Sequence, residues 1–187
     1  MSEIRVDAIK TRAGAVPTAN DVGINVAGTI LQVLYTQYTS TTTVSISANT
    51  DTALTDLTVN ITPKSTSSII RLDAHVMHEW GRGDAPTESM WFFYRDTTKL
   101  AAPSNGNRST GITPSKLSYY DNDATSTPEG VNYTYFDSPS STSQITYKIG
   151  VRNHFGTNLH LNKTGDDANT TQAERGVSFI SVMEIGG

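Results

Sequence analysis

Residues 176–185 carry apolar side chains on both sides of an extended chain. One side holds Val177, Phe179, Met183 and Ile185, and the other holds Ile180 and Val182 between Ser178 and Glu184. Apolar groups on both sides are typical of a strand in the middle of a sheet, with both faces covered. We therefore predict that this segment closes a β-domain whose other strands come from earlier in the chain.

Short alternations of apolar and polar residues fill most of the chain from residue 28 onward. In the clearest one, Ile70, Leu72, Ala74 and Val76 are expected to face a core, and Arg71, Asp73 and His75 to face outward. Residues 90–94 and 99–101 flank the polar turn 95–98 and predict a hairpin. Further strands are predicted around residues 31–35, 44–46, 57–61, 131–135, 145–151 and 159–161. Without any sustained helical period, this pattern predicts an all-β fold, an antiparallel jelly roll or β-sandwich over residues 28–187.

The first 27 residues differ from the rest because their apolar residues are few and widely spaced. Those expected to make contacts are Ile4, Val6, Ile9, Val16 and Ile24. This is too little apolar surface to bury alone, so residues 1–27 are interpreted as an extended anchoring arm that becomes ordered against other proteins by strand addition. The alternative is a flexible leader of the kind common at chain termini.

Two predicted strands have more apolar surface than one sandwich can cover. They are the segment around 31–35 and the closing segment 177–185, each apolar on both sides. We predict that sister copies cover the second side in a homotrimer. The residues expected at the trimer interface are Leu31, Val33, Tyr35, Phe179 and Met183.

Composition excludes several classes of protein. The formal net charge is −4, so no basic face exists for nucleic acid. The chain has no Cys, which removes disulfides and fits assembly in a reducing cytoplasm. Neither a secretory signal nor an apolar run long enough to cross a bilayer is present, so no membrane insertion is expected.

Aromatic residues next to predicted loops are the candidate binding groups. Exposed rings can stack on sugars, and neighbouring carboxylates can accept hydrogen bonds from sugar hydroxyls. The candidates for a host surface glycan are Trp80, Tyr119, Tyr120, Asp121 and Asp123. The alternative is burial in the core, which is the usual place for large aromatic side chains.

Signatures of catalysis and metal binding are missing from the sequence. There is no Cys nucleophile, no Gly-x-Ser-x-Gly motif, no phosphate-binding glycine loop and no His-Glu-x-x-His motif. His75 and His78 are three residues apart on a predicted strand and therefore point to opposite faces. We expect no enzyme activity, no cofactor and no metal site.

Five segments resemble a known family. Residues 2–11 and 28–33, together with 61–68, 137–142 and 175–185, are similar to tail-fibre and other virion proteins of marine bacteriophages, including cyanophages. The resemblance covers most of the chain, although residues 80–130 match nothing in it.

The resemblance implies a non-enzymatic virion structural protein, a trimeric tail or appendage fibre whose jelly-roll knob meets the host surface. The arm would attach it to other virion proteins, after assembly in the host cytoplasm. The alternative is a capsid decoration, collar or adaptor protein with no receptor role. A cellular carbohydrate-binding module also fits a sandwich but leaves the arm unexplained.

Overall fold

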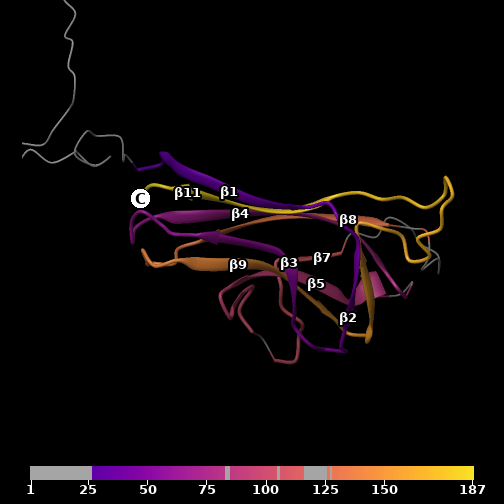
Figure 1. The fold of residues 1–187 in the computed structure, drawn as a ribbon. Helices are drawn as coiled ribbons and strands as arrows, with labels where there is room; N and C mark the ends of the chain where they lie inside the picture. Colours follow the sequence, from indigo (N-terminus) through magenta and orange to yellow (C-terminus); the bar gives the residue numbers. More distant parts are fainter. Residues whose placement is uncertain (1–26, 83–84, 105, 116–125, 127) are drawn as a thin grey trace, which may run out of the picture.

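A computed structural model describes residues 27–82, 85–104, 106–115, 126 and 128–187 (Figure 1). Strands form two sheets. The first contains β1 (Ile30–Tyr38), β2 (Thr42–Ile46), β4 (Ile69–Trp80), β8 (Glu129–Asp137), β10 (Thr157–Leu161) and β11 (Ser178–Ile185). The second contains β3 (Thr52–Ile61), β5 (Ser89–Arg95), β6 (Thr98–Leu100), β7 (Thr113–Pro114) and β9 (Ile145–Asn153). Between β4 and β5 lies a short 3₁₀ helix, η1 (Ala85–Glu88).

The antiparallel strand pairs are nested inside one another. The outermost pair is β1 with β11, followed inward by β2 with β10, β3 with β9, β4 with β8, and the hairpin β5–β6. The two outermost pairs lie in the first sheet, and from β3 with β9 inward the pairs alternate between the two sheets, as they do in a jelly roll. The prediction of an all-β antiparallel sandwich is therefore confirmed.

Strand β11 lies between β1 and β4, as its apolar pattern predicted. Its Ile180 and Val182 are fully buried between the sheets. Its opposite side is open among the described residues, where Val177 and Phe179 are 41% and 37% exposed. Within the part of the chain that the structure describes, no second layer packs on the outside of this sheet, so the cover of that side by sister copies stays a prediction.

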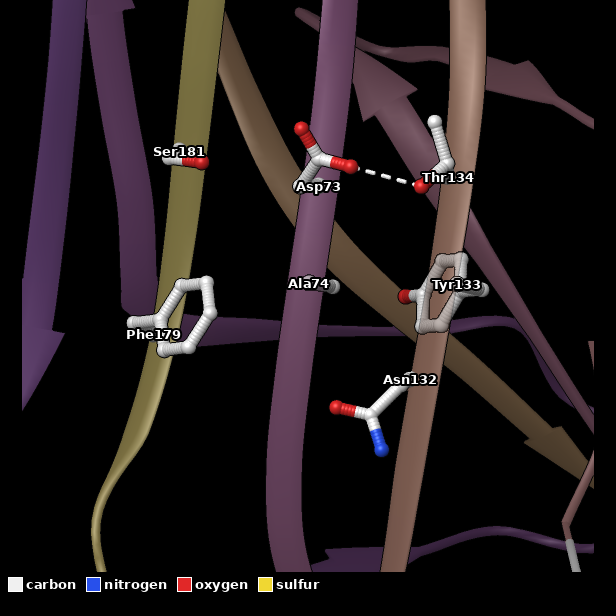
Figure 2. A pocket seen from close by; sticks show the side chains of 7 residues that line it. All are labelled: Asp73, Ala74, Asn132, Tyr133, Thr134, Phe179 and Ser181. Atoms are coloured by element: carbon white, nitrogen blue, oxygen red, sulfur yellow. Dashed lines mark hydrogen bonds between the residues drawn. The ribbon is translucent and has the colours of Figure 1, made fainter.

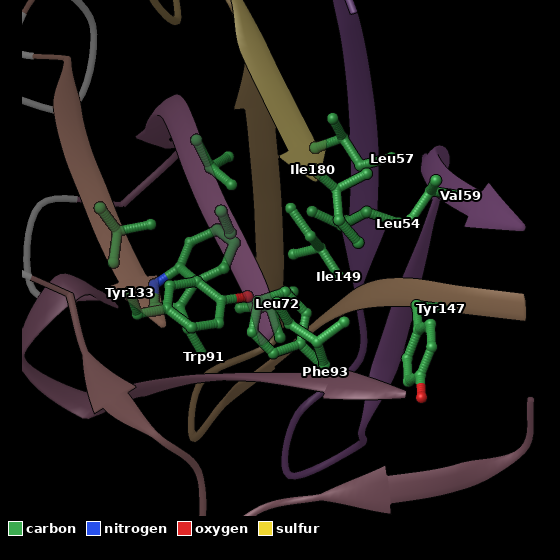
Figure 3. Packing of buried hydrophobic residues seen from close by; sticks show 14 of the residues in the cluster. Leu54, Leu57, Val59, Leu72, Trp91, Phe93, Tyr133, Tyr147, Ile149 and Ile180 are labelled. Atoms are coloured by element: carbon green, nitrogen blue, oxygen red, sulfur yellow. The ribbon is translucent and has the colours of Figure 1, made fainter. Parts of the chain in front are cut away.

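The core fills the space between the two sheets (Figure 3). Leu72 of β4 and Ile180 of β11 pack from the first sheet, against Phe93 of β5 and Ile149 of β9 from the second. Along β4 the burial alternates as the sequence predicted, with Ile70, Leu72, Ala74 and Val76 inside. A period of two residues puts every second side chain on the core side.

Trp80 belongs to this core. Only 1% of the residue is exposed, and its ring lies 6.3 Å from that of Trp91. The Ser115 hydroxyl accepts hydrogen bonds from both indole N–H groups, at 3.4 Å from Trp80 and 2.8 Å from Trp91. The interpretation of Trp80 as an exposed receptor-binding ring is therefore wrong: it is the last residue of β4 and packs inward.

Among the described residues, no helix is long and apolar enough to cross a membrane. The predicted arm residues Ile4, Val6, Ile9, Val16 and Ile24 lie outside the described residues, as do Tyr119, Tyr120, Asp121 and Asp123. The division between residues 27 and 28 and the roles of these side chains stay predictions.

Candidate functional site: the outer face of the first sheet

Register across four strands of the first sheet builds an open outer face. Val33 pairs with Met183, Met183 with Arg71, and Arg71 with Phe136, so these four side chains form one row across β1, β11, β4 and β8. The other rows follow at intervals of two residues. Outward-facing residues are Ile30, Val33, Tyr35 and Gln37 on β1; Phe179, Ser181, Met183 and Ile185 on β11; Ile69, Arg71, Asp73 and His75 on β4; and Asn132, Thr134 and Phe136 on β8.

One end of this face is apolar except for Arg71, which lies between Met183 and Phe136. We call it the apolar end and define it as Ile30, Val33, Ile69, Phe136, Met183 and Ile185. Ile30 is 56% exposed, Val33 51% and Phe136 59%. Contiguous apolar side chains with this much exposure are typical of a surface that another molecule covers.

The apolar end lies where residues 27–29 enter the sandwich. The Gly28 amide donates to the carbonyl of Gly186 at 2.7 Å, and the Gly186 amide donates to that of Thr29 at 2.8 Å. The start of β1 is therefore fixed beside the end of β11 (Figure 1). The connection 162–177, which leads into β11, emerges at the opposite end of the sandwich.

The middle of the outer face is polar and internally hydrogen-bonded. Arg71 forms an ion pair with Asp73 at 2.9 Å, and the Thr134 hydroxyl donates to the Asp73 carboxylate at 2.6 Å. His75 Nδ1 lies 2.7 Å from the side-chain oxygen of Asn132. A shallow hollow over Ala74 lies among these groups, with the Phe179 ring on its β11 side (Figure 2).

This arrangement suits binding of a partner molecule better than catalysis or metal binding. Its charged pair is already matched, and its apolar groups lie next to one another on the outward side of the sheet. Among the described residues, no three His, Asp or Glu side chains converge into a group that could hold a metal ion. The face can bury apolar area against a partner without leaving an unmatched charge.

The residues predicted at a trimer interface mostly lie on this outer face. Val33 and Tyr35 of β1 are exposed, and Phe179 and Met183 of β11 lie beside that strand. Leu31 is half-buried, at a register shift between Ile30 and Gln32. The structure therefore brings four of the five together on one surface, whereas their role in assembly stays a prediction.

Sequence reasoning predicted that Arg71, Asp73 and His75 of β4 face outward, but it missed Ile69 of β4 and Phe136 of β8. Phe136 faces outward in a strand whose inward residues Val131 and Tyr133 were recognised, and an aromatic group on the outward side was the available signal. Ile69 was missed because it lies at the first residue of β4. Which strands are neighbours depends on register, which the sequence does not reveal.

A buried acid–base pair lies inside the sandwich, away from the outer face. His78 Nε2 is 3.8 Å from Glu129 Oε2, and neither atom has a hydrogen-bond partner among the described residues. Burial lowers the pKa of His78 to about 4. Burial, and to a smaller extent the charge of Glu79, raises the pKa of Glu129 to about 8. Both groups are therefore largely neutral at pH 7.

Comparisons with known proteins identify no family for this chain. No family model and no curated protein matches the chain. The VP2 subviral particle of infectious bursal disease virus overlays with a TM-score of 0.42 at 10% identity, over 96% of this chain and 46% of that one. The Gx strain of the same virus overlays with a TM-score of 0.33 at 9% identity, over 84% and 43%. This chain thus spans less than half the length of either protein, and overlays of this quality assign neither a family nor a role.

Proposed function

We propose that this chain is a non-enzymatic structural protein of a virus particle, a trimeric phage tail or appendage fibre. In this proposal residues 1–27 attach it to other virion proteins. The jelly-roll sandwich is the knob, and its loops contact the host surface.

The exposed apolar end of the outer face carries this proposal. A protein that works as an isolated monomer rarely exposes a strip of this kind, whereas a subunit of a larger assembly needs one. The resemblance of five sequence segments to virion proteins of marine bacteriophages supports the same role.

The two ends of the sandwich also suit a fibre. Residues 27–29 enter beside the apolar end, whereas the connection 162–177 emerges at the other end (Figure 1). An arm that faces the particle would therefore leave this connection facing outward. Within it, Asp167 is held by Arg175 at 2.8 Å and by Lys163 at 3.7 Å.

Electron microscopy of purified particles with gold-labelled antibody against this chain tests the proposal. Label on the tail or on appendages is the expected result. Label on the capsid or collar would instead favour a decoration or adaptor protein, and particles without label would contradict a virion role.

Host contact needs its own measurement, because a structural role does not require it. Purified chain is expected to bind cells of the host and to slow adsorption of the phage in proportion to its concentration. A chain that is present on the tail but leaves adsorption unchanged would remove host contact from the proposal and keep the structural role.

A further inference from the structure

We infer that the apolar end of the outer face is the contact between copies of this chain, and that this contact brings residues 27–29 of the copies, where the predicted arms begin, close together. The inference rests on the proposed function, from which it takes the number of three copies. It adds where the copies touch and which end of the knob faces the particle.

The chemistry of the surface favours a second copy as its occupant. The six residues of the apolar end include no charged group, and the neighbouring Arg71 is already matched by Asp73. A partner must therefore offer an uncharged apolar surface in return. The same surface on another copy has this composition, so the contact leaves no charge unmatched.

Strand β1 is the edge strand of the first sheet, and its edge is only partly tied to the second sheet, through the Thr36 hydroxyl, which donates to the Thr58 carbonyl of β3 at 2.6 Å. Over its nine residues, Ile30–Tyr38, it carries neither a charge nor a proline. Natural proteins usually interrupt such edges with Lys, Pro or a covering element, since they otherwise aggregate. A closed set of copies that covers Val33 and Tyr35 removes these exposed apolar side chains from water.

The apolar residues occur at both edges of the four-strand face. Val33 is on β1 at one edge, and Phe136 is on β8 at the other, in the same row. When the β1 side of one copy packs against the β8 side of the next, each copy uses two different patches. Contacts of this head-to-tail kind close into a ring when the rotation permits.

The apolar end lies beside the point at which the predicted arm joins the sandwich. Gly28 is tied to Gly186 beside this end, and 27 residues precede it. Copies that meet there start their arms close together, whereas copies that met at the opposite end would start them far apart.

Light scattering on the full chain and three variants tests the contact. The unaltered chain is expected at three times 20.2 kDa. Val33→Glu and Phe136→Glu, at opposite edges of the face and in the same row, are expected to reduce the mass to that of one chain. Thr98→Glu, a matched exposed strand position on β6 of the second sheet, should keep the full mass. Circular dichroism and a cooperative thermal melt check that each variant is folded. If a Glu variant is not folded, Phe136→Ser takes its place, and its copies are expected to associate at least tenfold more weakly than those of the unaltered chain.

Spin labels test the orientation without disturbing the contact. The chain contains no Cys, so Ala27→Cys and Thr170→Cys each introduce one labelling site, and both positions are exposed. In the assembled chain the distance between labels at position 27 is expected to be shorter than the distance between labels at position 170. The reverse order would overturn the inference, as would full assembly of both Glu variants.

The outcomes separate the inference from the proposed function. A monomer that is nevertheless found on particles means that another virion protein covers the apolar end; the inference then fails and the structural role stands. A chain that assembles through this face but is absent from particles contradicts the proposed function and keeps the contact.

Discussion

At the scale of single residues, side chains between the sheets tolerate little change. Trp80 shows this most clearly, because its ring packs beside Trp91 and both indole N–H groups share the Ser115 hydroxyl. Removing the ring would leave a large cavity and take one donor away from that hydroxyl.

Trp80→Ala is expected to lower the free energy of unfolding by about 3–5 kcal/mol, the usual cost of deleting a buried aromatic ring. Urea unfolding followed by tryptophan fluorescence and circular dichroism measures it. Thr98→Ala, at an exposed strand position, should change stability by less than about 0.5 kcal/mol. A Trp80→Ala protein as stable as the parent would contradict the burial of this ring.

Gly150 is required for close packing within a strand, not for a turn. It lies in the middle of β9, opposite Phe92 of β5, and a Cβ placed on it would collide with the Phe92 ring. The ring itself is fully buried and has the Lys99 ammonium 4.0 Å from its centroid.

Gly150→Ala is therefore expected to destabilise the chain by about 1–3 kcal/mol through overpacking. Gly130→Ala is the matched control, since it also lies in a strand and its added Cβ would have His75 as nearest neighbour at 3.9 Å. Thermal melts of both variants measure the difference in stability. Equal melting temperatures would show that Phe92 moves aside without cost.

At the scale of elements, the junction of β4 and β8 should make stability depend on pH. His78 and Glu129 pair across these strands and are buried together. The pKa of Glu129 rises from its ordinary value of 4.5 to about 8, so the stability that it contributes at low pH is lost as the pH rises toward 8. The pKa of His78 falls from 6.5 to about 4, so stability is lost as the pH falls through that range.

The two effects cancel between about pH 4.5 and 6.5, and only that of Glu129 remains above. The free energy of unfolding is expected to fall by about 2 kcal/mol between pH 6.5 and 8. Glu129→Gln, which cannot ionise, should remove that fall. Urea unfolding at a series of pH values measures both proteins, and parallel curves would refute the assignment to Glu129.

The fold depends on strand β11 more than on any other element. It separates β1 from β4, and Glu184 within it accepts hydrogen bonds from the Ser68 hydroxyl at 2.7 Å and the Lys64 amide at 2.6 Å. A chain that ends at Gly176 is expected to lose its cooperative thermal transition. A chain that lacks residues 1–27 is the control and should melt like the parent; if it does not, the predicted division at residue 27 is wrong.

These elements show what the sequence could predict. The alternation over β4 and the apolar pattern of β11 identified both strands, because a period of two residues directly reflects burial. Trp80 was misread because a Gly-rich turn follows it, and a strand can bury its last residue. Phe136 and Ile69 were missed because the outer face exists only once β1, β11, β4 and β8 are in register, and register depends on contacts between distant segments.

At the scale of the whole molecule, the uncharged composition of the apolar end predicts how assembly responds to salt. Screening weakens contacts between charges and leaves apolar burial intact. The mass from light scattering is therefore expected to stay constant between about 50 mM and about 1 M sodium chloride, although the Debye length falls to about 3 Å at the higher concentration. The melting temperature should rise with protein concentration, because association stabilises the folded chain. Dissociation by salt would show that ion pairs hold the copies together.

The nesting of strand pairs also has a consequence for the time course of synthesis. Ile30 and Ile185 are neighbours in the sheet although about 150 residues separate them along the chain. At roughly 5–20 residues per second, a ribosome needs roughly 8–30 s to produce the partner of β1 after β1 itself. During that interval β1, which is apolar and uncharged, lacks its partner strand β11. Early binding of a chaperone to the nascent chain would therefore determine what fraction of the protein folds correctly.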